Sequence, residues 1–194
     1  QQEGIVELLE NSEVTSMLQI KDTQKIELKI NEKALSSTTT NVLRNAGDLT
    51  ITGAGTISTT GENAYAITNV GTLKADSVTI NSAYRGIYNT GKASLNNTKV
   101  SVGDIAVRNL ENGIINVNSG AILQATTTGE TVSYGIYSTS TNENAVIVNG
   151  GKIISNSDKG TAFRNKKYCN RKNTVNRRSN NRGNIFKWCC TRCS

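Results

Sequence analysis

The sequence contains neither histidine nor proline, and its aromatic residues are few. Without histidine, the commonest general base and metal ligand of proteins is missing, so an enzyme here would depend on carboxylates, Lys, Tyr or Cys. The chain is instead rich in Thr, Asn, Ser, Gly, Val and Ile. This composition favours many short strands joined by tight turns over a bundle of helices.

Cysteine and acidic residues are each confined to one part of the chain. All four cysteines lie at or after Cys169, and all 15 acidic residues lie at or before Asp158. The segment before Arg164 therefore has no thiol and a small negative net charge, whereas the ten Lys and Arg residues from Arg164 onward are accompanied by no acid. A basic surface for nucleic acid or anionic lipid is expected only in this last segment, and no nucleic-acid binding is expected of the body.

Long apolar runs are also missing. No segment approaches the roughly 20 apolar residues that a membrane-spanning helix needs, so no membrane span is expected. The first residues do not have the pattern of a secretory signal either. The compartment of the protein therefore cannot be inferred from a targeting sequence.

A four-residue motif recurs along the chain. It consists of a small or β-branched residue, an aliphatic residue, an outward-facing residue and Asn. The first four copies, spaced by 24, 20 and 20 residues, end at Asn45, Asn69, Asn89 and Asn109. Two later copies end at Ser138 and Asn165, and their longer spacings predict loops inserted near residues 126–131 and 138–144. After each of the first four copies come a Gly and then two short alternating strands.

A period near 20 residues indicates a solenoid. It is too short for a βαβ unit, which needs about 30 residues, but it matches one coil of a parallel β-helix. Each strand would pair with the same strand of the next coil, about 4.8 Å away. A leucine-rich repeat is disfavoured because Leu is scarce and no helical segment is evident. The motif aliphatics would stack inside the solenoid as Leu43, Ile67, Ile87, Val107, Ile136 and Phe163.

The sequence therefore predicts an all-β fold, a right-handed parallel β-helix of about six coils. Residues 1–35 alternate less regularly and are interpreted as a first coil that caps the solenoid, since terminal repeats are often atypical. Residues 36–165 are the regular coils. Residues 166–194 are a basic, Cys-containing tail outside the repeat.

The motif asparagines are expected to form a ladder at one corner of the solenoid, each side-chain amide bonding to the next coil. Their register follows the aliphatic stack, which favours a ladder over the plainer interpretation of independent turn-forming residues. The ladder would consist of Asn45, Asn69, Asn89 and Asn109.

The tail from Lys166 onward is predicted to be disordered or the product of a reading-frame shift. The strand alternation stops after the motif copy at residues 162–165, where acids vanish and cysteines appear. Moving the frame forward by one nucleotide turns Trp188 into Gly, and residues 189 and 190 into Ala or Val, so a coil-like pattern lies in the neighbouring frame. The alternatives are a basic binding tail and a zinc site at Cys190 and Cys193, whose spacing lacks a second CxxC pair.

Three runs carry a resemblance to a known family: residues 4–10, residues 26–31 and residues 45–58, Asn-Ala-Gly-Asp-Leu-Thr-Ile-Thr-Gly-Ala-Gly-Thr-Ile-Ser. With the coils up to about residue 165, they resemble pectate-lyase-like right-handed parallel β-helix domains of large surface proteins from gut and other Gram-positive bacteria. The resemblance implies a secreted or cell-surface location and a role as stalk, adhesin or glycan-contacting module. Its partners would be host or bacterial glycans or surface proteins. Where the family usually has Asn-Gly-Lys, this chain has Asn31-Glu32-Lys33, so that corner is expected to be built differently.

Pectin-cleaving relatives would add a cluster of acids holding calcium and a basic catalytic residue. Here Asp48, Asp76 and Asp104 stand at different distances from their motif asparagines, so they are expected on different flanks as isolated carboxylates. No catalytic residue, metal site or cofactor is therefore predicted. The expected function is a non-catalytic structural or adhesive segment of a bacterial surface protein. The alternative is a carbohydrate-active β-helix, lyase- or hydrolase-like, or a glycan-binding module.

Tyrosines recur near the ladder position and are the candidate glycan contacts, because tyrosines on one flank of a solenoid could stack on sugar rings. The plainer interpretation is that Tyr is a favourable outward residue of a strand. Two stand directly before the ladder position and three stand four or five residues before it: Tyr88 and Tyr137, then Tyr65, Tyr84 and Tyr134.

Overall fold

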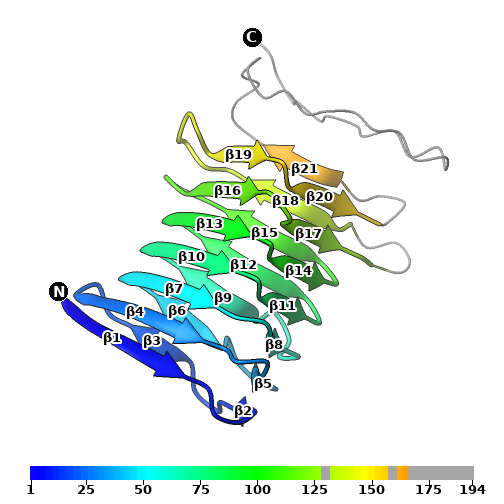
Figure 1. Ribbon diagram of the computed structural model, residues 1–194. Helices are drawn as coiled ribbons and strands as arrows, with labels where there is room; N and C mark the ends of the chain where they lie inside the picture. The colour runs from blue at the N-terminus through cyan, green and yellow to red at the C-terminus, as the bar shows by residue number, and fades with distance from the viewer. Residues whose placement is uncertain (128–131, 157–160, 166–194) are drawn as a thin grey trace.

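The computed structural model describes residues 1–127, 132–156 and 161–165. Within these ranges the chain forms 21 strands and no helix, and the strands wind into a solenoid whose coils stack along one axis (Figure 1). The predicted tail, with its cysteines and its basic residues after residue 165, lies outside the described residues. The frame-shift interpretation and its alternatives therefore stay predictions.

Three parallel sheets, here called A, B and C, form the sides of the solenoid, and each has seven strands within the described residues. Sheet A contains β1 (Gln2–Glu7), β4 (Gln24–Lys29), β7 (Asp48–Thr52), β10 (Thr72–Asp76), β13 (Lys92–Asn96), β16 (Ile114–Asn118) and β19 (Val146–Asn149). Sheet B contains β2 (Ser12–Glu13), β5 (Ala34–Ser37), β8 (Thr56–Thr59), β11 (Thr79–Ser82), β14 (Lys99–Val102), β17 (Ile122–Ala125) and β20 (Lys152–Ser155). Sheet C contains β3 (Leu18–Ile20), β6 (Leu43–Asn45), β9 (Tyr65–Asn69), β12 (Arg85–Asn89), β15 (Ile105–Asn109), β18 (Tyr134–Ser138) and β21 (Thr161–Asn165).

The strands pair in register from coil to coil, as the repeat predicts. In sheet C, Ile67 pairs with Ile87, which pairs in turn with Val107. Five of the six residues of the predicted aliphatic stack are in this register and fully buried: Leu43, Ile67, Ile87, Val107 and Ile136. The backbone of residue 163 continues the column opposite Ile136, whereas the Phe163 side chain lies outside the described residues.

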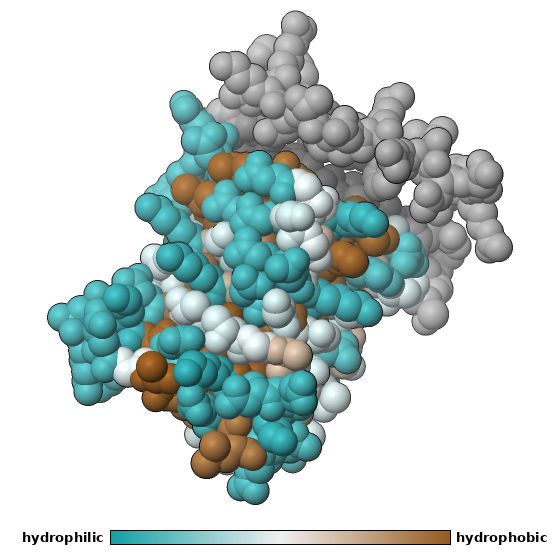
Figure 2. Space-filling view, in the orientation of Figure 1, coloured by the Kyte–Doolittle hydropathy of each residue, from teal (hydrophilic) through white to brown (hydrophobic). Residues whose placement is uncertain are grey.

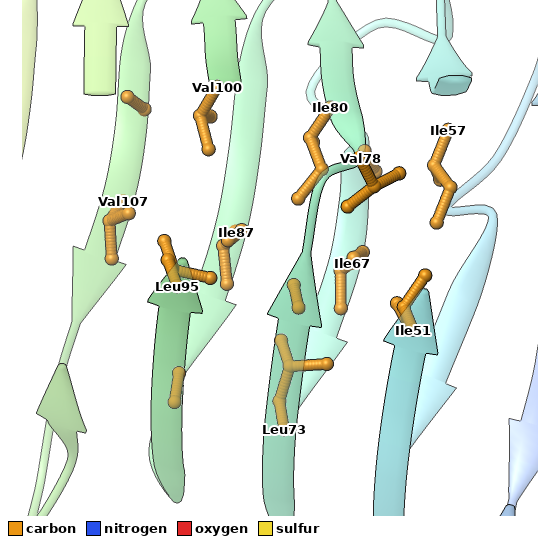
Figure 3. Packing of buried hydrophobic residues seen from close by; sticks show 14 of the residues in the cluster. Ile51, Ile57, Ile67, Leu73, Val78, Ile80, Ile87, Leu95, Val100 and Val107 are labelled. Carbon is orange, nitrogen blue, oxygen red and sulfur yellow. The ribbon is translucent and has the colours of Figure 1, made fainter. Parts of the chain in front are cut away.

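The interior is filled by aliphatic side chains from all three sheets. Figure 3 shows Ile51, Ile80 and Ile87, from sheets A, B and C respectively, pointing into the same space between the sheets. Full burial of one such side chain contributes about 1.5–3 kcal/mol, and the alternation of buried and exposed positions along each strand places one set of residues inside and the other in solvent. The body is therefore held by its core, since it contains no cysteine.

The N-terminal segment departs from the regular repeat. Residues 1–35 contain β1 to β4 and the start of β5, so they hold a complete first coil and part of a second. Each sheet has seven strands in the described residues, one more than the number of coils predicted. The four-residue motif cannot be recognised in the first coil because its asparagine is replaced by Ile20, which pairs with Asn45 of the second coil. Apolar side chains are exposed at this end of the solenoid (Figure 2): Ile5, Val6, Leu9 and Leu18.

The predicted irregularities are found in the connections. The corner between β4 and β5 has two successive non-glycine residues with positive φ, Asn31 at 54° and Glu32 at 61°, whereas the next corner on that side uses Gly53 and Gly55. An inserted loop, residues 139–145, joins β18 to β19, and a second insertion separates β17 from β18. Residues 128–131 of this second insertion lie outside the described residues.

The corner between sheets C and A depends on glycine because the backbones of successive coils touch there. A Cβ at Gly91 would lie 2.6 Å from the Val70 carbonyl carbon and closer still to the carbonyl oxygens of Val70 and Gly71. We expect Gly91→Ala to lower the free energy of unfolding by about 1–3 kcal/mol, the usual cost of overpacking. Gly4→Ala is the matched control, because its Cβ would meet only the Ile26 Cδ1 atom at 3.5 Å. Denaturant unfolding of both variants tests this, and equal effects would contradict it.

Candidate functional site

The outer face of sheet C gathers tyrosine and arginine side chains in two columns. One column directly follows the inward motif aliphatics and alternates with them, so it is turned to solvent. The other column stands two residues before the aliphatics, and its Tyr65 and Ile105 are buried. The first column runs Tyr65, Arg85, Ile105, Tyr134, and the second runs Arg44, Thr68, Tyr88, Arg108, Tyr137, Arg164. We call this surface the Tyr–Arg face, defined by Arg44, Tyr65, Arg85, Tyr88, Arg108, Tyr134, Tyr137 and Arg164.

The tyrosines of the Tyr–Arg face pack in two edge-to-face pairs. The rings of Tyr65 and Tyr88 have centroids 5.4 Å apart at an interplanar angle of 74°. The rings of Tyr134 and Tyr137 are also 5.4 Å apart, at 64°. Such pairs contribute about 0.5–1.5 kcal/mol beyond the area they bury, so each ring is held in place by its neighbour.

Guanidinium groups lie over three of these four rings, those of Tyr65, Tyr134 and Tyr137. The Cζ atom of Arg85 lies 5.5 Å from the centre of the Tyr65 ring, that of Arg108 lies 5.9 Å from the Tyr137 ring, and that of Arg164 lies 5.7 Å from the Tyr134 ring. A cation over an aromatic face is attracted by the quadrupole of the ring. Tyrosine and arginine side chains therefore contact one another from coil to coil between β9 and β21.

Hydrogen bonds between coils tie the layer further. Arg108 donates from Nη1 to the Tyr65 hydroxyl at 3.3 Å, and Arg164 donates from Nη1 to the Tyr134 hydroxyl at 2.8 Å. The hydrogen bond with Tyr65 raises the pKa of the Arg108 guanidinium, against a smaller opposing effect of burial, so this side chain stays charged. Its Nε atom is buried without a hydrogen-bond partner.

Arg85 is the member of the face that is neutralised. Its Nε lies 3.3 Å from Asp104 Oδ2, and its two Nη groups donate to the side chain and the backbone carbonyl of Asn63, at 2.9 and 3.4 Å. Every nitrogen of this guanidinium is therefore engaged. Arg85 contributes to the rigidity of the face and adds little net charge to it.

The structure brings four of the five candidate tyrosines together and separates the fifth. Tyr65, Tyr88, Tyr134 and Tyr137 form the two ring pairs, and Tyr65 is only 8 % exposed. Tyr84 is 42 % exposed at the turn before β12, where its backbone N–H donates to Ser82 Oγ. Tyr65 therefore presents almost no free surface for a sugar to stack on, and guanidinium groups lie over Tyr134 and Tyr137.

The arginines of the face are functional candidates that the motif analysis did not single out. Arg44, Arg108 and Arg164 occupy the same motif position as Tyr88 and Tyr137, directly before the ladder residue. The signal was available in the sequence, because the outward position of the motif is Arg or Tyr in five of its six copies.

The asparagine ladder is confirmed. The Nδ2 groups of Asn45, Asn69 and Asn89 donate to the Oδ1 atoms of the next coil's asparagine at 2.8, 2.7 and 2.6 Å, and all the ladder residues are fully buried. Asn109, the last asparagine of the ladder, donates to the backbone carbonyl of Ala145 at 3.0 Å. At the other end of the ladder, Asn45 Oδ1 has no donor because Ile20 of the first coil stands where an asparagine would be. The ladder fixes coil register and is a structural feature.

The three aspartates considered as calcium ligands lie on different parts of the solenoid. Asp104 pairs with Arg85, Asp76 accepts from Ser77 and Asn97 at 2.8 and 3.2 Å, and Asp48 lies in a shallow depression of sheet A that Lys25 also lines. Within the described parts of the chain, no three His, Cys, Asp or Glu residues lie close enough to hold a metal ion.

Two ion pairs connect the first two coils. Lys25 Nζ lies 2.9 Å from Glu3 Oε1, and Lys29 Nζ lies 2.9 Å from Glu7 Oε1. The hydrogen bond with Lys25 lowers the pKa of Glu3, and those with Glu3 and Glu7 raise the pKa values of Lys25 and Lys29. The pairs are exposed, so their contribution to stability is small.

Comparison with known proteins gives no match: no family model fits the chain, and no curated protein or solved structure is significantly similar to it. Among the residues that the structure describes, none form a helix with the length and apolar character needed to cross a bilayer. The parallel β-helix fold therefore rests on the chain's own repeat, strand pairing and buried columns.

Proposed function

We propose that this chain is a non-catalytic, rigid segment of a bacterial surface protein, a stalk or adhesin of the pectate-lyase-like kind that its sequence resembles. The observation that carries the proposal is the uninterrupted in-register stack, in which the buried asparagines bond one coil to the next. A solenoid with such a stack resists bending and slippage between coils and displays repeated outer faces along its length.

The chemistry of the outer faces supports a scaffold over an enzyme. The carboxylates of Glu3, Glu7 and Asp104 are each paired with a base of a neighbouring coil. Asp76 accepts hydrogen bonds from Ser77 beside it and from Asn97 of the next coil. A carboxylate that is held by a structural cation is not poised to bind calcium or move a proton. Glu3, Glu7 and Asp104 therefore link neighbouring coils.

A glycan-binding module is the second candidate, and the Tyr–Arg face is the observation that favours it. This face spans the six sheet C strands from β6 to β21, and its tyrosines are held by ring pairs and guanidinium contacts. A preorganised surface of this kind binds without loss of side-chain freedom. The two candidates are compatible, since a stalk can carry a binding face.

A turnover screen separates the scaffold from its enzymatic rival. We expect no release of unsaturated uronides from acidic polysaccharides with added calcium, measured by ultraviolet absorbance against an authentic pectate lyase as the positive control. Robust turnover, abolished by a chelator, would contradict the proposal.

Surface location is tested separately by brief protease treatment of intact cells of the source organism, which is expected to release peptides from residues 1–165. Their retention in intact cells would contradict surface display.

A further inference from the structure

Three arginines of the Tyr–Arg face form a row along the solenoid axis. Arg44, Arg108 and Arg164 occupy one column of sheet C, on β6, β15 and β21. At about 4.8 Å per coil, Arg108 lies about 14 Å from Arg44 and about 10 Å from Arg164 along the axis. Within the described residues none of the three is paired with a carboxylate. The row is therefore a line of uncompensated positive charge on a body whose acids outnumber its bases.

The guanidinium groups of this row retain hydrogen-bonding capacity. Arg44 makes no side-chain hydrogen bond to another described residue. Its side chain is half-buried, and its unpaired nitrogens all reach solvent. Arg108 uses Nη1 on Tyr65, while its Nη2 is likewise neither bonded nor buried. A guanidinium fork of this kind matches the oxygens of a bound oxyanion and is more weakly hydrated than an ammonium group.

The covered tyrosine rings narrow the chemistry of the ligand. Unstacked bases and neutral sugars bind to open aromatic faces, but here guanidinium groups lie over Tyr65, Tyr134 and Tyr137. The face therefore presents N–H donors and hydroxyl groups. It suits a ligand that brings spaced oxyanions and hydroxyls in an extended line.

We propose that the Tyr–Arg face binds a linear sulfated polysaccharide lying along the solenoid axis, with sulfate groups contacting Arg44, Arg108 and Arg164 in turn. A sulfate ester stays ionised and offers three acceptor oxygens to each fork, and a linear polymer can follow the row from coil to coil. The tyrosine hydroxyls accept or donate hydrogen bonds to the sugar. This inference specifies the ligand of the adhesive surface segment proposed above and rests on that function.

The test uses heparin as the probe and the full-length chain with its Lys and Arg residues from Lys166 onward replaced by Gln, so that the tail carries no cationic side chains. We expect the double variant R44Q/R108Q to bind heparin at least about tenfold more weakly by titration calorimetry, equal to about 1.4 kcal/mol. The matched control K92Q/K99Q removes the same charge from the exposed faces of sheets A and B. Its affinity should change by about threefold at most, because charges off the face act only through screened attraction.

Two further arms make the result specific. The variant R44K/R108K keeps the charge but loses the planar fork, so its affinity should fall between those of the parent and R44Q/R108Q. Polygalacturonate and single-stranded DNA should bind more weakly than heparin at the same ionic strength. Equal losses in R44Q/R108Q and K92Q/K99Q, or equal affinity for any of the three polymers, would overturn the inference. Affinity is independent of turnover and surface location, so this inference can fail while the scaffold function stands.

Discussion

Replacing Asn89 with alanine is expected to lower the free energy of unfolding by about 3–5 kcal/mol. The Asn89 side chain accepts from Asn69 at 2.7 Å and donates to Asn109 at 2.6 Å, and its Nδ2 also lies 3.1 Å from the carbonyl oxygens of Gly91 and Ile114. Its removal leaves several fully buried polar groups without this partner, and each such group costs about 1–3 kcal/mol. Equilibrium unfolding in urea measures the change.

The matched control for Asn89 is Asn81→Ala in β11. Asn81 lies in the middle of the solenoid too, but its side chain is exposed on the outer face of sheet B. An exposed substitution away from special features changes stability by about 0.5 kcal/mol or less. Similar losses for Asn81→Ala and Asn89→Ala would contradict the ladder as the source of the effect.

Replacing Ile87 with alanine is expected to cost about 2–5 kcal/mol, because Ile87 is fully buried between Ile67 and Val107 in the central part of the stack. Removing a buried aliphatic side chain forfeits its transfer free energy and leaves a cavity that the rigid columns cannot close. The urea midpoint and slope report the loss.

The control for the Ile87 variant is Ile5→Ala, at a β1 side chain that is 62 % exposed. This substitution should change stability by about 0.5 kcal/mol or less. A larger loss at Ile5 than at Ile87 would contradict the assignment of the interior columns.

The solenoid and its ladder could be predicted because each repeat of the sequence forms one coil of the structure. Each copy of the motif occupies the same place on sheet C, so the spacing of Asn69, Asn89 and Asn109 directly gave the length of a coil. Inward aliphatics and outward polar residues alternate in each copy, which determines the face each residue occupies.

The first coils could not be divided correctly from the sequence because the motif residue is missing there. Ile20 occupies the ladder position of the first coil, and Asn31 and Glu32 adopt a turn that glycine usually makes. The strands are nevertheless formed, because pairing with the next coil, rather than local sequence, determines their register.

The Tyr–Arg face shows a different limit. The sequence places Tyr88 and Arg108 on the same column, but whether a ring lies open or covered depends on side-chain conformations that neighbouring coils set together. The four tyrosines are paired edge to face, and three of their rings lie beneath guanidinium groups. The ligand chemistry proposed for the face is therefore hydrogen bonding with oxyanions, in place of stacking on sugar rings.

The central claim is that successive coils pair in parallel and in register, and disulfide mapping tests it most directly, since the body has no cysteine and the four in the tail can be replaced by serine. Asp48 of β7 pairs with Thr72 of β10, whereas antiparallel pairing of the same strands would bring Asp48 opposite Asp76. Directly paired strand residues are about 4.8 Å apart, within the range a disulfide bridges. We predict that the cysteine pair D48C/T72C forms a disulfide on mild oxidation and that D48C/D76C does not. Efficient linkage of D48C/D76C with none in D48C/T72C would contradict the parallel β-helix.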